Sequence, residues 1–127
     1  MPEHPNAELW RRAQAAFSRR DIDALKEVWA EDIVYHFPGK SRLAGDHKGI
    51  EAVVALFAQL FKAAQITEVH DVLASDDHVV ALIRLTLSRE GQGVSINQAN
   101  IYHVRDGKLT EAWLLPTDQA AMDEFLP

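Results

Sequence analysis

The chain has 127 residues, which is enough for one domain with one hydrophobic core and too few for two ordinary domains. Its 19 Asp and Glu residues outnumber its 13 Lys and Arg residues, and the resulting net charge of −6 disfavours a nucleic-acid partner. The sequence contains no Cys, which excludes disulfides, thiolate nucleophiles and cysteine-ligated metal centres.

The start of the chain and its longest apolar run bear on location. Residues 1–6, MPEHPN, lack the basic and apolar segments of a secretory signal. The longest nearly apolar run, residues 52–61, is interrupted by Gln59 and is much shorter than the about 20 residues that cross a bilayer. We therefore expect a soluble, cytoplasmic protein that is a single domain, residues 1–127, without a membrane partner.

The N-terminal part of the sequence predicts two helices and a strand. Asn6 suits the N-cap of a first helix, because apolar residues recur after it at helical spacing. Asp21 can cap a second, short helix with its own apolar stripe. The β-rich run 33–37 then predicts a strand, which residues 38–39, Pro and Gly, bring to an end.

From residue 40 onward the sequence predicts one more helix, followed mainly by strands. A polar loop over residues 40–48 precedes Gly49, which begins the longest predicted helix; its wide apolar face extends to Ala64. After Gln65 the apolar period changes from 3.6 to 2, which is typical of strands. The predicted strands span residues 67–74, 78–89, 94–105 and 108–115.

Short turns connect these predicted strands. Residues 90–93 and 106–107 match hairpin connections, and Pro116 ends the last strand before a helical turn that contains Met122. Helices that precede hairpin-linked strands indicate an α+β fold, in which helices cover one face of an antiparallel sheet. Because long strands in a small domain must curl, we expect the sheet to enclose a cavity.

Three groups of motifs carry a family resemblance. They are DIDAL (21–25) with WAEDIVYHFPG (29–39), LAG (43–45) with GIEAV (49–53), and YHVRDGKLTEAW (102–113). Together with the order of elements, they make nearly the whole chain resemble the SnoaL-like and ketosteroid-isomerase-like branch of the NTF2-like superfamily. The resemblance implies an NTF2-like (cystatin-like) cone, with a strongly curved antiparallel sheet wrapped around the long helix and an internal pocket. It also implies a homodimer through the outer face of the sheet.

Strand alternation and aromatic residues suggest the lining of that pocket. The residues assigned to the concave side of the two long strands are Ile83, Leu85, Leu87, Gln98, Asn100 and Tyr102. The residues expected to contact a small apolar ligand are Phe17, Trp29, Phe57, Phe61, Ile83, Leu85, Leu87, Gln98, Tyr102 and Trp113. Trp10 is a further candidate. Aromatic residues at such spacing also suit a solid core, and the face taken by Trp113 stays open.

His36 and Asn100 are the residues that could carry chemistry. The resemblance places His36 where ketosteroid-isomerase-like members have a carboxylate base, and an imidazole with an ordinary pKa of about 6.5 suits that role. It places Asn100 where those enzymes have a protonated acid that donates to an oxyanion, which an amide can also do. The alternatives are a structural His36 bonded to a loop, and an Asn100 that bonds Gln98 or trapped water.

The sequence departs from the isomerase pattern at other positions. Residues 13–17, AQAAF, lack the Tyr that is the main oxyanion donor of those enzymes, and Phe57 replaces a supporting Tyr. The predicted alternation turns Arg84 outward, which weakens the case for the Asp–Arg–Asp relay of epoxide hydrolases. No His-x-His or His-x-x-x-His spacing predicts a metal site, and we expect no cofactor.

Three functions remain open on this basis. The first is a cofactor-independent proton-transfer enzyme, of the isomerase, cyclase or dehydratase type, acting on an apolar carbonyl compound. In it His36 would be the base and Asn100 the oxyanion donor, so both must lie on the same side of the sheet. The second is a non-catalytic module for binding a hydrophobic ligand or for dimerisation. The third is an epoxide or ester hydrolase with a His-activated water.

Overall fold

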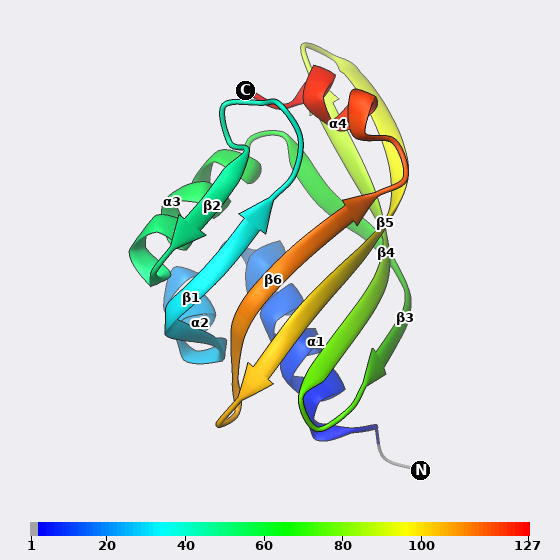
Figure 1. Cartoon of the computed structure of the whole chain (residues 1–127). Helices are drawn as coiled ribbons and strands as arrows, with labels where there is room; N and C mark the ends of the chain where they lie inside the picture. Colours follow the sequence, from blue (N-terminus) through cyan, green and yellow to red (C-terminus); the bar gives the residue numbers. More distant parts are fainter. Residues whose placement is uncertain (1–2) are drawn as a thin grey trace.

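Four helices and six strands make up the computed structural model, which describes residues 3–127 (Figure 1). The helices are α1 (Pro5–Arg19), α2 (Ile22–Val28), α3 (Ile50–Leu60) and α4 (Gln119–Phe125). The strands are β1 (Trp29–Phe37), β2 (Gly45–Lys48), β3 (Ala64–Ala74), β4 (His78–Arg89), β5 (Gln92–Arg105) and β6 (Lys108–Pro116). This composition confirms the predicted α+β fold class.

The first two helices begin with side-chain caps. The cap of α1 is His4 rather than the predicted Asn6: the His4 imidazole accepts from the Asn6 amide N–H. Pro5 suits the first helical position, where no N–H donor is needed. α2 begins after its predicted cap, Asp21, whose carboxylate accepts from the amide N–H of Ala24.

The helix predicted from Gly49 to Ala64 is shorter than expected. α3 ends at Leu60 after 11 residues, so α1, with 15 residues, is the longest helix in the described part of the chain. β3 begins at Ala64, three residues before its predicted start, because its first residues already pair with β4. Backbone hydrogen bonds to the sheet therefore override an apolar spacing that would also suit a helix.

The strands form one mixed sheet in the order β2-β1-β6-β5-β4-β3. Its neighbouring strands are antiparallel except β1 and β6, which run parallel. This pair corrects the expectation of a purely antiparallel sheet. The chain leaves β1, passes through α3 and the hairpins of β3 to β5, and returns beside β1 in the same direction. β2 lies within the predicted polar loop 40–48 and pairs with the free edge of β1.

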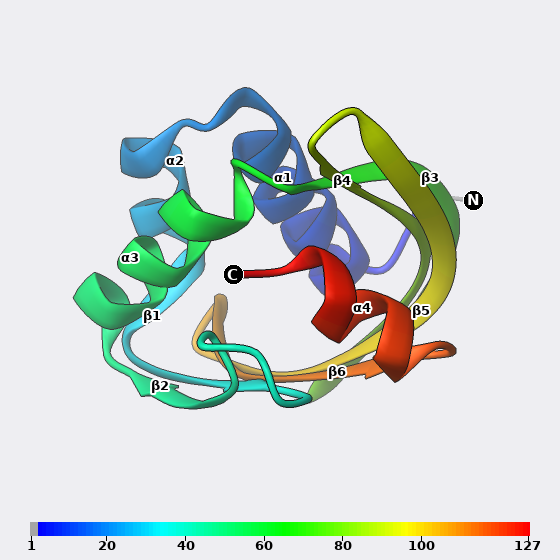
Figure 2. The same cartoon turned by 90° about the horizontal axis from the view of Figure 1, so that it is seen from above.

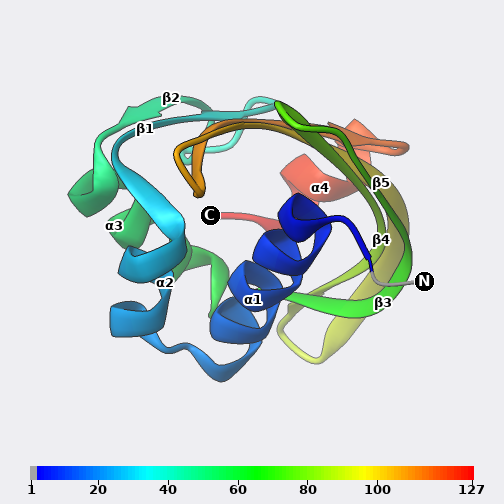
Figure 3. The same cartoon turned by 90° about the horizontal axis from the view of Figure 1, so that it is seen from below.

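The sheet is strongly curved, as the resemblance implies. Register shifts mark irregular pairing in β1–β6, β3–β4 and β5–β6, and bulges of this kind increase local bending and twist. Figure 2 shows the sheet as an arc with α1 and the C-terminal segment on its inner side. Figure 3 shows from the opposite side that α1 and α3 both lie against the concave face. Two helices, rather than the one long helix expected, thus fill the cone.

Apolar side chains between the helices and the concave face form one core. The largest side chains that are almost completely buried are Leu25, Ile33, Val53, Val79, Leu87, Leu109 and Met122. On β4 and β5 burial alternates as predicted, with Ile83, Leu85 and Leu87 inside and Arg84 and Ser88 exposed. No helix within residues 3–127 is both long and apolar enough to cross a membrane.

Candidate functional site

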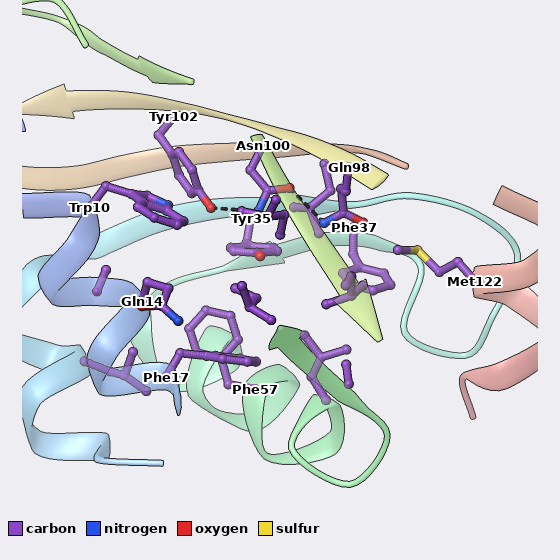
Figure 4. Close-up of a pocket in the computed structure, with 18 of the residues that line it drawn as sticks. Trp10, Gln14, Phe17, Tyr35, Phe37, Phe57, Gln98, Asn100, Tyr102 and Met122 are labelled. Carbon is purple, nitrogen blue, oxygen red and sulfur yellow. Dashed lines mark hydrogen bonds between the residues drawn. The ribbon is translucent and has the colours of Figure 1, made fainter. Parts of the chain in front are cut away.

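A cavity lies between the concave face of the sheet and helices α1, α3 and α4 (Figure 4). The cavity has a volume of about 630 Å³ when its open mouth is included. Within it, the centre of a water molecule can occupy a volume of only about 60 Å³. A ligand of more than a few heavy atoms therefore needs lining side chains to move aside. The predicted residues that line the cavity are Trp10, Phe17, Trp29, Phe57, Ile83, Leu85, Leu87, Gln98, Asn100 and Tyr102.

Other lining residues were not predicted from the sequence. Tyr35 and Phe37 project into the cavity from β1, and Gln14 does so from α1. Met122 and Leu126, from α4 and the residue after it, close one end. Met122 is an unbranched, flexible side chain, so this end is well suited to adjust to a ligand.

The polar part of the lining is a row of three side chains on β5, Gln98, Asn100 and Tyr102, which we call the amide ladder. Alternate residues of a strand point to the same face, so all three enter the cavity. Gln98 Nε2 donates to Asn100 Oδ1 at 2.8 Å, and Asn100 Nδ2 donates to the Tyr102 hydroxyl at 3.0 Å (Figure 4). The three residues are 4%, 4% and 3% exposed, respectively.

Two buried polar atoms of the lining residues have no hydrogen-bond partner among residues 3–127. They are Gln98 Oε1, at one end of the amide ladder, and the indole Nε1 of Trp29. A buried polar group without a partner costs about 1–3 kcal/mol. Because a carboxamide oxygen accepts and an indole N–H donates, the lining offers one unused acceptor and one unused donor to a water or a ligand.

The described lining is uncharged. It contains no Asp, Glu, His, Lys or Arg. Burial raises the pKa of Tyr35 well above its ordinary value, and it raises the pKa of Tyr102 to about 12 although hydrogen bonds from Trp10 and Asn100 act in the opposite direction. Both tyrosines therefore keep their protons at physiological pH. Elsewhere in residues 3–127, no group of three or more His, Asp and Glu side chains is arranged to hold a metal ion.

His36 lies on the outer face of β1, outside the cavity. Its Nδ1 is 2.6 Å from Asp46 Oδ1, its Nε2 is 2.6 Å from Glu111 Oε2, and its ring stacks on Trp113. Because ionised carboxylates only accept hydrogen bonds, both contacts are hydrogen bonds only when the ring is protonated and donates from both nitrogens. Desolvation lowers the pKa of His36, but the hydrogen bonds to Glu111 and Asp46 together outweigh it and raise the pKa above its ordinary value.

The structure separates the two residues that the sequence proposed as a catalytic pair. Tyr35 and Phe37, on either side of His36 in β1, line the cavity, so alternation turns His36 to the other face. Asn100 points into the cavity. A base and an oxyanion donor need hydrogen-bond reach to one substrate, and this geometry does not provide it. The expected position of His36 in the pocket is thereby corrected.

Two other expected ligand contacts also lie elsewhere. Trp113 is beside His36 on the outer face, where it packs against the rings of His36 and His103. Its apolar neighbours in β6 made its face ambiguous in the sequence. Phe61 packs against Phe17 but lines a neighbouring groove between the ends of α1 and α3 and strands β3 and β4. Phe17 borders both spaces, so Phe61 stands next to the cavity rather than in it.

A curved sheet with helices on its concave side and a mostly apolar cavity between them defines an NTF2-like domain. The family model of the SnoaL-like domain matches residues 10–112. An uncharacterised protein of Mycobacterium tuberculosis is 34% identical over 129 residues, which cover 98% of each chain. The chain therefore belongs to the SnoaL-like domain family.

Solved structures agree with this assignment. Bal32a, from a soil-derived mobile gene cassette, is 34% identical, has a TM-score of 0.88 and matches over 97% of each chain. An NTF2-like protein from Burkholderia xenovorans is 24% identical, with a TM-score of 0.86, and the match covers 100% of this chain and 99% of the other. This second likeness is one of fold alone. The NTF2-like fold expected from the sequence motifs is thus confirmed.

Proposed function

We propose that the protein binds a small, uncharged and mostly apolar molecule in the cavity, without acid–base catalysis. The observation that carries the proposal is the lining. It is aromatic and aliphatic, includes no ionised side chain in the described part of the chain, and leaves Gln98 Oε1 and Trp29 Nε1 unpaired there. Small-molecule sites commonly combine such an apolar wall with a few polar groups that orient the ligand.

The lining favours binding over proton transfer. A general base must reach the substrate proton at about 3 Å, directly or through one water. No carboxylate or imidazole lines the cavity within residues 3–127, and burial raises the pKa values of Tyr35 and Tyr102. The isomerase, cyclase or dehydratase hypothesis and the His-activated hydrolase hypothesis both require His36 on the cavity side. Binding needs no such group.

Tryptophan fluorescence can test the proposal at the cavity itself. Trp10 and Trp29 line the cavity and Trp113 does not, so a Trp113→Phe variant reports from the cavity alone. We expect the neutral ketone 1-indanone to change this fluorescence and to raise the melting temperature. The anion indane-1-carboxylate, of similar shape, should bind at least about tenfold more weakly, because the cavity offers no counter-charge.

The same titrations can refute the proposal. It fails if 1-indanone leaves both the fluorescence and the melting temperature unchanged up to its solubility limit. It also fails if the carboxylate binds as tightly as the ketone. Wild-type protein, with Trp113 present, serves as the control that the Trp113→Phe substitution has not altered the melting temperature.

We also propose a homodimer formed through the outer face of the sheet. Leu115 on this face is 53% exposed, and register places it beside Ala99, which in turn lies beside Leu82. With Ile101 and Trp113 these residues form an outer apolar patch across β4, β5 and β6. Exposed apolar surface of this kind marks interaction sites. A cytoplasmic location remains a prediction from the sequence.

A further inference from the structure

We propose that the amide ladder reverses its hydrogen-bond direction, so that the cavity accepts a neutral ligand carrying either a hydroxyl or a carbonyl group beside Gln98. The inference rests on the proposed binding function and specifies the polar group of the ligand. It starts from the unpaired end of the ladder, because Gln98 Oε1 is buried in the cavity wall and has no partner among residues 3–127.

In the structure the ladder donates from Gln98 towards Tyr102. Gln98 Nε2 donates to Asn100 Oδ1, and Asn100 Nδ2 donates to the Tyr102 hydroxyl oxygen. The carboxamide oxygen of Gln98 is left over, so the ladder ends in a hydrogen-bond acceptor. A ligand hydroxyl beside Gln98 can donate to this oxygen and complete the row.

The same side-chain positions also fit the opposite direction. A half-turn of each carboxamide exchanges its oxygen and its nitrogen, and a tyrosine hydroxyl can donate as well as accept. The Tyr102 hydroxyl then donates to the Asn100 oxygen, and the Asn100 nitrogen donates to the Gln98 oxygen. The Gln98 nitrogen is now the free end, and a ligand carbonyl can accept from it.

The groups around the ladder leave both directions available. Each direction makes two hydrogen bonds within the ladder, so their number favours neither. At the far end the Tyr102 hydroxyl can turn its hydrogen towards Asn100 or away from it. No charged side chain of the described lining biases the row. The ligand's polar group therefore sets the direction.

Reversal changes the specificity that the cavity would otherwise have. A fixed acceptor discriminates strongly against a ketone, because two acceptors leave each other unpaired in the buried site. A fixed donor serves an alcohol and a ketone alike, so the Asn100 contacts must separate that case from reversal. A ladder that reverses avoids this cost for both. An alcohol and a ketone on one hydrocarbon skeleton should then bind with similar affinity, and both should bind more tightly than the hydrocarbon.

Calorimetric titration with indane, 1-indanol and 1-indanone tests this. We expect the alcohol and the ketone each to bind about fivefold to tenfold more tightly than indane, and within about threefold of each other. In a Gln98→Met variant both advantages should disappear while the affinity for indane is kept. Asn97→Ala, one residue earlier on the opposite face of β5, is the matched control and should preserve all three affinities.

Nuclear Overhauser effects in the wild-type protein provide a second test that does not depend on a variant. The Asn100 side-chain NH₂ should contact the Tyr102 ring in the 1-indanol complex and the Gln98 side chain in the 1-indanone complex. If only one of the alcohol and the ketone gains affinity over indane, or if the Asn100 contacts do not change, the ladder has a fixed direction and the inference is wrong while the proposed function stands. If none of the three compounds binds, the proposed function fails and the inference fails with it.

Discussion

At the scale of single residues, His36 connects three strands of the sheet. From β1 it bonds Asp46 of β2 and Glu111 of β6, and its ring stacks on Trp113 of β6. Both hydrogen bonds need a protonated ring, so they link the stability of this sheet edge to pH. Other ionisable groups near this cluster are Lys48 and His47, which act on Asp46, and His103, whose Nδ1 lies 3.4 Å from Glu111.

Stability is expected to fall as the pH rises through the raised pKa of His36. The folded protein holds the His36 proton more tightly than the unfolded chain does. Its contribution is therefore complete below about pH 6.5, the ordinary imidazole pKa, and is lost as the pH rises through the higher pKa of the folded state. Urea unfolding between about pH 6 and pH 9 measures the effect, which should be at most about 1 kcal/mol for a partly exposed ion pair.

A His36→Gln variant should weaken this dependence on pH. The exposed His70 on β3 offers the control, and His70→Gln should leave the dependence as it is in the wild type. The lowered pKa of Asp46, caused chiefly by its hydrogen bond to His36, acts in a different range: its contribution is present above the ordinary carboxyl pKa of about 3.9 and is lost as the pH falls. Equal slopes of unfolding free energy against pH in the wild type and in His36→Gln, between about pH 6 and pH 9, would contradict the role assigned to His36.

At the scale of elements, the loop after β1 holds α4 against the end of the cavity. The Asp123 carboxylate of α4 accepts from the Lys40 amide N–H at 2.9 Å and from Gln119 Nε2 at 3.1 Å. Gly39 has φ +98° and lies so close to Asp123 and Gln119 that an added Cβ would overlap both side chains. A residue at 39 larger than Gly would therefore push these side chains away and break their hydrogen bonds.

We expect Gly39→Ala to destabilise the protein more than Gly45→Ala does. Gly45 has φ +117° with open space around it, so that substitution reports backbone strain alone. The additional cost at Gly39 should be about 1–2 kcal/mol, the value of two hydrogen bonds. Chemical denaturation of the two variants measures the difference. Equal losses of stability would show that the loop does not hold α4 in this way.

The elements also show where a single sequence is informative. The pattern of β4 and β5 predicted both strands and their inner faces, because strict alternation leaves little choice of face. In β1, aromatic Tyr35 and Phe37 flank His36 and line the cavity, so strand alternation turns His36 outward, whereas the family resemblance implied an inward position. β2 has the sequence GDHK, which shows no apolar alternation from which a strand could be predicted. Only its pairing with β1 makes it a strand.

At the scale of the whole molecule, the order of elements predicted the α+β class and the curved sheet correctly. The parallel pairing of β1 and β6 could not be predicted in this way, because it depends on where a distant strand returns. The unpaired Gln98 oxygen could not be predicted either, since it depends on which neighbours approach Gln98 in the folded chain. The alternate spacing of polar residues on β5 predicted the amide ladder. Which atom of the ladder lacks a partner is defined only by the folded chain.

The assembly of the molecule is the remaining expectation at this scale. The outer apolar patch lies on the face of the sheet turned away from the helices, and a second copy of the chain would cover Leu115 there. A charge buried in such an interface has no partner and is costly. Leu115→Glu should therefore shift the protein from dimer to monomer in light scattering coupled to size exclusion. Ala58→Glu, at an exposed position on α3, should leave the dimer intact. A wild-type protein that is monomeric at high micromolar concentration would contradict the proposal, and so would a Leu115→Glu variant that remains a dimer.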